Sequence, residues 1–162
     1  MKEYYIEQIC EVIGGGTPST AVPEYWGDDI VWLTPKDLSN NTKRYIFDSA
    51  TRISKLGLKQ SSARMLPKDT VLLSSRASIG YLAIAGVELC TNQGFKSMIC
   101  NRNFVLPEYL YYLLQTKVEE LNAISTGSTF KELSGSTLKG YIVSVHSLPE
   151  QQHIVDSRRM IA

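Results

Sequence analysis

The chain is poor in the residues that build metal and redox sites. It has three cysteines and two histidines, and Cys10, Cys90 and Cys100 show no CxxC spacing. A structural zinc site needs four ligands, and His146 and His153 are not spaced with the cysteines as in a zinc finger. We therefore interpret the cysteines as buried, reduced thiols that pack as small hydrophobic side chains, and we expect no metal site.

The common motifs of nucleic-acid enzymes and hydrolases are also absent. No two of the six prolines are adjacent, which excludes the Asn-Pro-Pro-Tyr and Asp-Pro-Pro-Tyr motifs of adenine methyltransferases. The sequence has no P-loop for ATP, no acidic residue two positions before a lysine, as nucleases use, and no GxSxG nucleophile elbow. These absences favour binding over catalysis, and we predict no catalytic residue and no cofactor in this chain.

Long apolar runs and a strong charge imbalance are missing as well. No run approaches the roughly 20 residues of a membrane helix, and residues 1–5 lack the apolar core of a signal peptide, so we expect a cytoplasmic protein with no membrane partner. The 162 residues, 43% apolar and 20% charged, are typical of one globular domain. The net charge is only +1, so binding to DNA would depend on local clusters or on a larger assembly.

Apolar spacing along the chain predicts a mixed α+β fold (α/β in the broad sense). Strands are expected at residues 30–33, 70–75, 81–85, 96–100 and 141–145, the second and third of them as a hairpin. Helices are expected at residues 6–13, 53–58 and 107–122, and from the capping patterns that begin at Thr34, Thr129 and Ser147. We expect one twisted, largely antiparallel sheet with short helices around it and a C-terminal helix that leaves the body.

The opening turn is the most distinctive segment. It reads Gly14-Gly15-Gly16-Thr17-Pro18-Ser19-Thr20, in which a glycine triplet allows φ > 0 and Pro18 stiffens the exit. Trp26 and Trp32 follow closely, and we expect them to pack in the core rather than to stack on bases. No general base or activated nucleophile is present, so the segment is interpreted as a structural signature.

Further short motifs follow in a fixed order. They are Tyr25-Trp26-Gly27, Trp32-x-x-x-x-Asp37, Ile53-x-x-x-Gly57-Leu58-x-x-Ser61, Ser74-Ser75-Arg76-Ala77-Ser78-Ile79-Gly80, Asn92-Gln93-Gly94, Thr126-Gly127-Ser128-Thr129 and Leu148-Pro149-Glu150-Gln151-Gln152. Each motif is weak alone. Their order and spacing resemble the target recognition domain of the specificity subunit of Type I restriction–modification enzymes over nearly the whole chain.

This resemblance implies a domain that reads one half of a bipartite target in double-stranded DNA. Residues 1–147 would form the recognition domain, and residues 148–162 would begin the spacer helix that docks on a partner helix. Methyltransferase and restriction subunits would be the protein partners, and S-adenosylmethionine, ATP and magnesium would belong to them. A full-length specificity subunit carries a second copy, so we expect a trimmed chain or a half-length product, with self-association through a stripe of Ile154, Val155 and Ile161.

Side chains that could contact DNA lie in four polar segments. The loop over residues 34–44 mixes forked donors and acceptors suited to base edges and phosphates, although it could equally be a solvated surface. An arginine at a hairpin turn suits a phosphate or an acidic partner. Asn-Gln-Gly suits adenine contacts or simple turn formation, and a hydroxyl-rich helix start suits a phosphate or a cap. The candidate residues are Lys36, Asn40, Lys43, Arg44, Arg76, Asn92, Gln93, Ser128, Thr129 and Lys131.

Two other kinds of function remain open from the sequence. One is a freestanding DNA-binding or interaction module without methyltransferase partners, which neighbouring genes would distinguish. The other is an enzyme with an unfamiliar motif, which a tight cluster of acidic or histidine side chains in one pocket would favour.

Overall fold

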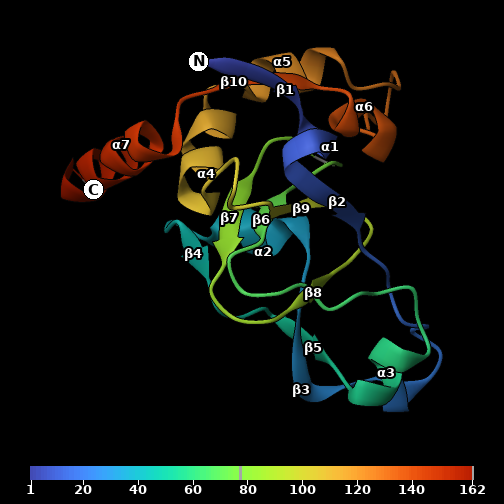
Figure 1. The fold of residues 1–162 in the computed structure, drawn as a ribbon. Helices are drawn as coiled ribbons and strands as arrows, with labels where there is room; N and C mark the ends of the chain where they lie inside the picture. The colour runs from blue at the N-terminus through green and yellow to red at the C-terminus, as the bar shows by residue number, and fades with distance from the viewer. Residues whose placement is uncertain (77, 162) are drawn as a thin grey trace.

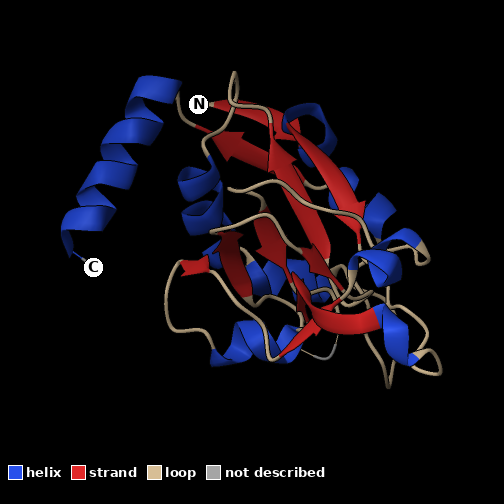
Figure 2. Ribbon diagram, turned by 90° about the horizontal axis from the view of Figure 1, so that it is seen from below, coloured by secondary structure: helices blue, strands red, loops and turns tan. Residues whose placement is uncertain are grey.

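The computed structural model describes residues 1–76 and 78–161, with the side chain of Ile161 left out of the description. Ala77 of the arginine turn and the side chain of Ile161 of the expected stripe therefore lie outside the described part of the chain. Three sheets form the scaffold (Figures 1 and 2). Their strand orders are β1 (Lys2–Tyr5)–β10 (Ile142–Val145), β2 (Cys10–Gly14)–β9 (Lys96–Cys100)–β6 (Val71–Leu73)–β7 (Leu82–Ala85)–β4 (Tyr45–Ile46), and β5 (Thr51–Ile53)–β3 (Trp26–Leu33)–β8 (Cys90–Thr91).

Short helices surround these sheets. They are α1 (Ile6–Ile9), α2 (Pro35–Asn40), α3 (Lys55–Lys59), α4 (Pro107–Gln115), α5 (Val118–Ala123), α6 (Gly135–Lys139) and α7 (Leu148–Ile161), with a 3₁₀ turn η1 (Pro23–Tyr25). The mixed α+β class and the largely antiparallel pairing are confirmed, although the strands divide among three sheets, and β4–β7 and β3–β8 are parallel.

The predicted hairpin forms the centre of the larger sheet. Val71 of β6 lies opposite Ile84 of β7 and also opposite Met98 of β9, and all three side chains are fully buried. Helix α4 packs on this sheet through Leu110 and Leu114, because apolar residues three and four positions apart share one face of a helix. The predicted strands over residues 96–100 and 141–145 are likewise present as β9 and β10.

Two predicted helices are shorter than expected. The helix over residues 6–13 stops after one turn, and the chain continues as β2, in which Cys10 lies opposite Cys100. Pairing with β9 outweighs the helical spacing here, since Val12 and Ile13 are β-branched and suit a strand. The helix over residues 107–122 is divided at Thr116, whose hydroxyl donates to the Leu113 carbonyl oxygen at 2.6 Å and ends α4; α5 follows.

The helix predicted from Thr129 is not formed. Glu132 instead exchanges backbone hydrogen bonds with Thr126, at 2.8 and 3.1 Å, and closes a loop in which Gly127 has φ of +107°. The next helix, α6, starts six residues later and is capped by Ser134, whose hydroxyl accepts from the Thr137 amide. The capping pattern was therefore misleading, because its acidic residue takes part in strand-like pairing.

Helix α7 starts where the Ser147 pattern predicts, with the Ser147 hydroxyl accepting from the Glu150 amide. Gln151 is fully buried, and its amide donates to the carbonyl oxygens of Phe104 and His146, both at 2.9 Å, and accepts from the Leu106 amide. Val155 is buried in the same core cluster as α4. Part of the expected stripe is thus covered by the domain itself, while Met160 is 89% exposed. Within the described residues no helix has the length and apolar character needed to cross a membrane.

Candidate nucleic-acid interface

The turn over residues 14–16 allows segments of backbone to pack closely against one another. A Cβ at Gly16 would lie 2.6 Å from the Ala63 amide nitrogen, and one at Gly15 would meet the Thr91 and Asn92 carbonyl oxygens. None of the three glycines has a positive φ, so the expected left-handed turn is wrong. Close backbone approach is the reason for glycine at Gly15 and Gly16.

The tryptophans of the opening motif support this turn. The indole of Trp32 is buried and donates to the Gly16 carbonyl oxygen at 3.0 Å. Trp26 packs edge-on against it, with ring centroids 5.2 Å apart. The prediction that these rings pack in the core is therefore confirmed for Trp32.

Asn92 and Gln93 lie at the turn that follows β8, and they differ in role. The Asn92 side-chain oxygen accepts from the Gly94 amide at 2.9 Å, and its backbone amide donates to Leu33. Asn92 is therefore engaged in forming the turn. Gln93 is exposed and accepts from the Thr17 hydroxyl, which places its amide at the surface beside the glycine turn.

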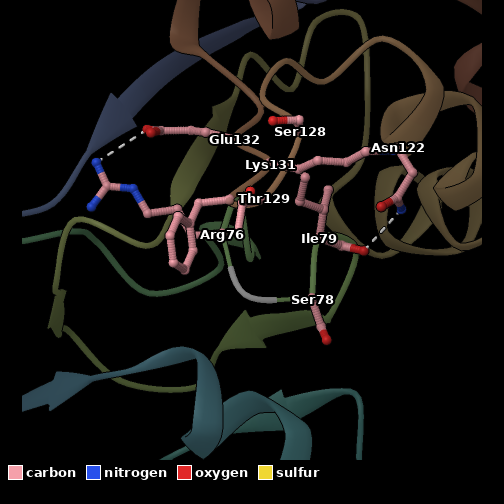
Figure 3. A pocket seen from close by; sticks show the side chains of 9 residues that line it. Arg76, Ser78, Ile79, Asn122, Ser128, Thr129, Lys131 and Glu132 are labelled. Carbon is pink, nitrogen blue, oxygen red and sulfur yellow. Dashed lines mark hydrogen bonds and ion pairs between the residues drawn. The ribbon is translucent and has the colours of Figure 1, made fainter.

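Arg76 is held beside the loop over residues 126–132, about fifty positions further along the chain (Figure 3). Its guanidinium lies 3.2 Å from the Glu132 carboxylate, and Lys96 lies 3.6 Å from the same oxygen. The Leu133 amide donates to the Ser75 carbonyl oxygen at 3.0 Å, which anchors the base of the loop. Arg76 foremost, with Lys96, holds the pKa of Glu132 below its usual range.

These segments enclose a hollow of about 680 Å³, which we call the Arg76 pocket. It is lined by Arg76, Ser78, Ile79, Asn122, Ser128, Thr129, Phe130, Lys131 and Glu132. Figure 3 shows the lining residues contributed by the hairpin turn, α5 and the loop, with Arg76 directed toward Glu132 and Asn122 toward Ile79. Four predicted site residues, Arg76, Ser128, Thr129 and Lys131, thus meet in one place. Two cations and three hydroxyls, those of Ser78, Ser128 and Thr129, form a set that can donate to phosphate oxygens and to base edges.

The other predicted residues lie elsewhere. Lys36 and Asn40 are exposed on α2, whose start is formed by Thr34 and Asp37 as predicted. Lys43 and Arg44 follow and line a second hollow, next to Tyr111 and Tyr112 of α4. The structure therefore separates the α2 residues from the Arg76 pocket, since no α2 residue lines it.

Several lining residues were missed by the sequence reasoning. Phe130 is 89% exposed at the loop tip, and Asn122 donates to the Ile79 carbonyl oxygen at 3.1 Å, which links α5 to the arginine turn. Glu132 was read as a helix cap. The one available signal was the clustering of serine and threonine around an isolated phenylalanine, which is unusual for a buried segment.

The described part of the chain contains no group of side chains that resembles a metal centre. Among those residues, no three histidine, cysteine or acidic side chains are grouped so that they could hold a metal ion. The thiols of Cys90 and Cys10 are poor nucleophiles, because burial raises the pKa of Cys90 to about 12, and the adjacent Cys100 thiol together with burial raises the pKa of Cys10.

The sequence, compared with known families, matches the Type I restriction modification DNA specificity domain over residues 1–157. The chain belongs to this family. It is 52% identical over 151 residues to the Type I restriction enzyme MjaIX specificity subunit of Methanocaldococcus jannaschii, covering 92% of this chain and 35% of that protein. It is 24% identical over 142 residues to the EcoprrI specificity subunit of Escherichia coli, covering 85% and 35%.

Solved structures show the same fold. The HsdS subunit from Thermoanaerobacter tengcongensis superposes with a TM-score of 0.72 at 18% identity, over 99% of this chain and 36% of that one. A chain from a structural study of complex assembly and conformational transition in the type I R-M system gives 0.76 at 20% identity, over 99% and 37%. This chain spans about a third of the length of these relatives.

Proposed function

We propose that this chain is a target recognition domain that binds one half of a bipartite DNA target and so determines where a Type I restriction–modification complex acts. The observation that carries the proposal is the match to the DNA specificity domain over residues 1–157. The chain would contribute recognition and no chemistry. Adenine methylation and cleavage would be carried out by partner subunits, which would use S-adenosylmethionine, ATP and magnesium.

The Arg76 pocket supports this proposal as one contact region. Lys131 is exposed on a loop whose base is tied to the hairpin, so its ammonium can reach a phosphate while the loop stays anchored. Arg76 keeps donors beyond the one that faces Glu132, since a guanidinium has five. We assign the hydroxyls of Ser128 and Thr129 to phosphate or base-edge contacts in the same region.

A second contact region is assigned to α2 and its neighbours. Lys36 and Asn40 project from an exposed helix, and an asparagine amide pairs well with adenine while a lysine donates to guanine. Gln93 is exposed at the neighbouring turn, and we assign it to the same contact region. Asn92 supports that turn from within.

The partners follow from the same proposal. Double-stranded DNA, the methyltransferase subunit and the restriction subunit would meet in the cytoplasm, with residues 1–147 on the DNA and residues 148–162 starting the spacer helix. We also propose that the chain self-associates through this helix. Exposed Met160 supports it, although Val155 is engaged by the domain itself.

The test is methylation mapping in a host without its own adenine methylation. The chain is co-expressed with the methyltransferase subunit of the same system, and modified adenines are located by sequencing. The proposal expects a bipartite motif that disappears when the chain is omitted. Methylation that is the same with and without the chain would contradict it, and failure to co-purify with the methyltransferase would favour a freestanding DNA-binding module.

A further inference from the structure

A second hollow, of about 640 Å³, is separate from the Arg76 pocket. We call it the tyrosine pocket. Most of its lining residues are aromatic or cationic, and the full lining is Thr42, Lys43, Arg44, Tyr45, Phe47, Tyr111, Tyr112, Gln115 and Arg158. They come from the segment around β4, from α4 and from α7, which lie together at one side of the molecule (Figure 1). No acidic residue is among the described residues that line it.

The charges in the tyrosine pocket are unbalanced. Lys43, Arg44 and Arg158 bring three cations, and none of them forms an ion pair within the described chain. Arg158 lies over the Tyr112 ring, 5.4 Å from its centroid. The nearby carboxylate of Glu108 accepts hydrogen bonds from Arg159 and from the Tyr45 hydroxyl, and the charge of Arg44 also helps to lower its pKa. One carboxylate therefore faces several cations, and positive charge remains in excess at this pocket.

Two residues that line the pocket also carry unsatisfied polar atoms. The Nε of Arg44 and the hydroxyl of Tyr112 are buried and have no hydrogen-bond partner among the described residues. Buried polar groups in folded proteins nearly always have partners, so an unpaired guanidinium nitrogen beside two further cations points to an anionic ligand. Phe47 is 59% exposed at the same site and offers an apolar face to the sugar of a nucleotide.

We propose that the tyrosine pocket binds a phosphodiester group of the DNA backbone without reading sequence. The inference rests on the proposed DNA-binding function and adds a site that includes Arg158 of α7. It gives Lys43 and Arg44 a positioning role in place of base recognition, because phosphate contacts fix register but carry no sequence information. It also supplies the local basic cluster that a chain of net charge +1 needs.

The test uses the whole 162-residue chain and two duplex oligonucleotides of unrelated sequence. Fluorescence anisotropy gives affinities over a salt series for the unaltered chain and for Lys43→Ala, Arg44→Gln and Arg158→Ala. Each variant should lower the slope of log K against log salt by up to about 0.9, equally on both duplexes, because the pocket neutralises one phosphate and each of the three cations contributes to that contact. Lys43→Arg should keep the slope, and Arg64→Ala, at an exposed arginine that faces Glu11, is the matched control.

The outcomes separate the two proposals. If the unaltered chain binds and the three variants keep its slope, the phosphate site is wrong while DNA binding stands. Loss on one duplex only would mean base reading by these side chains and would also overturn the proposal. If the unaltered chain binds neither duplex at low salt, both proposals fail. Calorimetric binding of ATP that Arg158→Ala abolishes, with DNA slopes unchanged, would identify a free nucleotide as the occupant instead.

Discussion

Replacing Gly57 with alanine should destabilise the domain, although helix propensity alone predicts the opposite. Gly57 lies in α3 and has no positive φ, so alanine would be favoured there by up to about 1 kcal/mol. The helix, however, lies directly against η1. A Cβ at this position would be 2.9 Å from the Tyr25 carbonyl carbon and closer still to its oxygen.

The size of the effect follows from what must move. The Tyr25 oxygen accepts from the Ser54 amide at 3.0 Å, and separating α3 from η1 breaks this bond, at about 1 kcal/mol. Overpacking against backbone costs typically about 1–3 kcal/mol. After subtracting the propensity gain, we expect a net loss of about 1–3 kcal/mol, with Tm falling by about 2–4 °C for each kcal/mol.

Thermal and urea unfolding of Gly57→Ala measure this loss, and Gly135→Ala is the matched control. Gly135 also lies in a short helix, but its added Cβ would approach nothing closer than 3.8 Å, at Lys96 Cε. The control should unfold at the same or a higher temperature than the unaltered chain. If Gly57→Ala matched or exceeded the unaltered chain in Tm, the close approach of α3 to η1 would be refuted as the reason for glycine in this motif.

Three further predictions concern recognition, pH and assembly. Lys36→Ala combined with Asn40→Ala should change or abolish the methylated motif of the assembled enzyme, since a lost base contact costs roughly 1–3 kcal/mol of discrimination; an unchanged motif in methylation sequencing would show that α2 does not read bases. The Arg76 guanidinium lowers the pKa of Glu132, so the ion pair stabilises the fold at pH values above the pKa of an unfolded glutamate, about 4.3, and this stabilisation is lost as pH falls. Urea unfolding from about pH 3 to 7 should therefore show that the stability of Glu132→Gln depends less on acid than that of the unaltered chain. The difference in the free energy of unfolding should be under about 1 kcal/mol, because both side chains are partly exposed. A version that continues α7 by further heptads should self-associate more strongly, and light scattering that shows a strict monomer at every length would exclude the helix as a dimer contact.

Local signals in the sequence identified much of the scaffold. The hairpin of β6 and β7 and the start of α2 were predicted because their residues form a local turn and a local cap. The starting turn of α7 likewise depends on residues that are adjacent in the chain. Such elements depend little on distant partners, and a single sequence is enough to place them.

The elements that sequence reasoning missed depend on partners far along the chain. Strand β2 exists because β9 lies beside it, and β1 because β10 does. Glu132 could be read as a cap because its real partners, Arg76 and Lys96, are at least 36 positions away. The same separation along the chain explains why several residues of the Arg76 pocket were predicted individually but their meeting in one pocket was not. It also explains why the sequence did not show that Lys36 and Asn40 lie away from this pocket.

The buried amide of Gln151 has a consequence for the geometry of any complex. Its three hydrogen bonds fix the first turn of α7 to the segment before α4 and to the end of β10, so the helix leaves at a set angle instead of swivelling on a hinge. The orientation of a helix fixed in this way determines the orientation of the domain. The spacing between two bound half-targets would then be set by helix length and this angle, and a change as small as Gln151→Ala could loosen the permitted spacing without touching any residue that faces DNA.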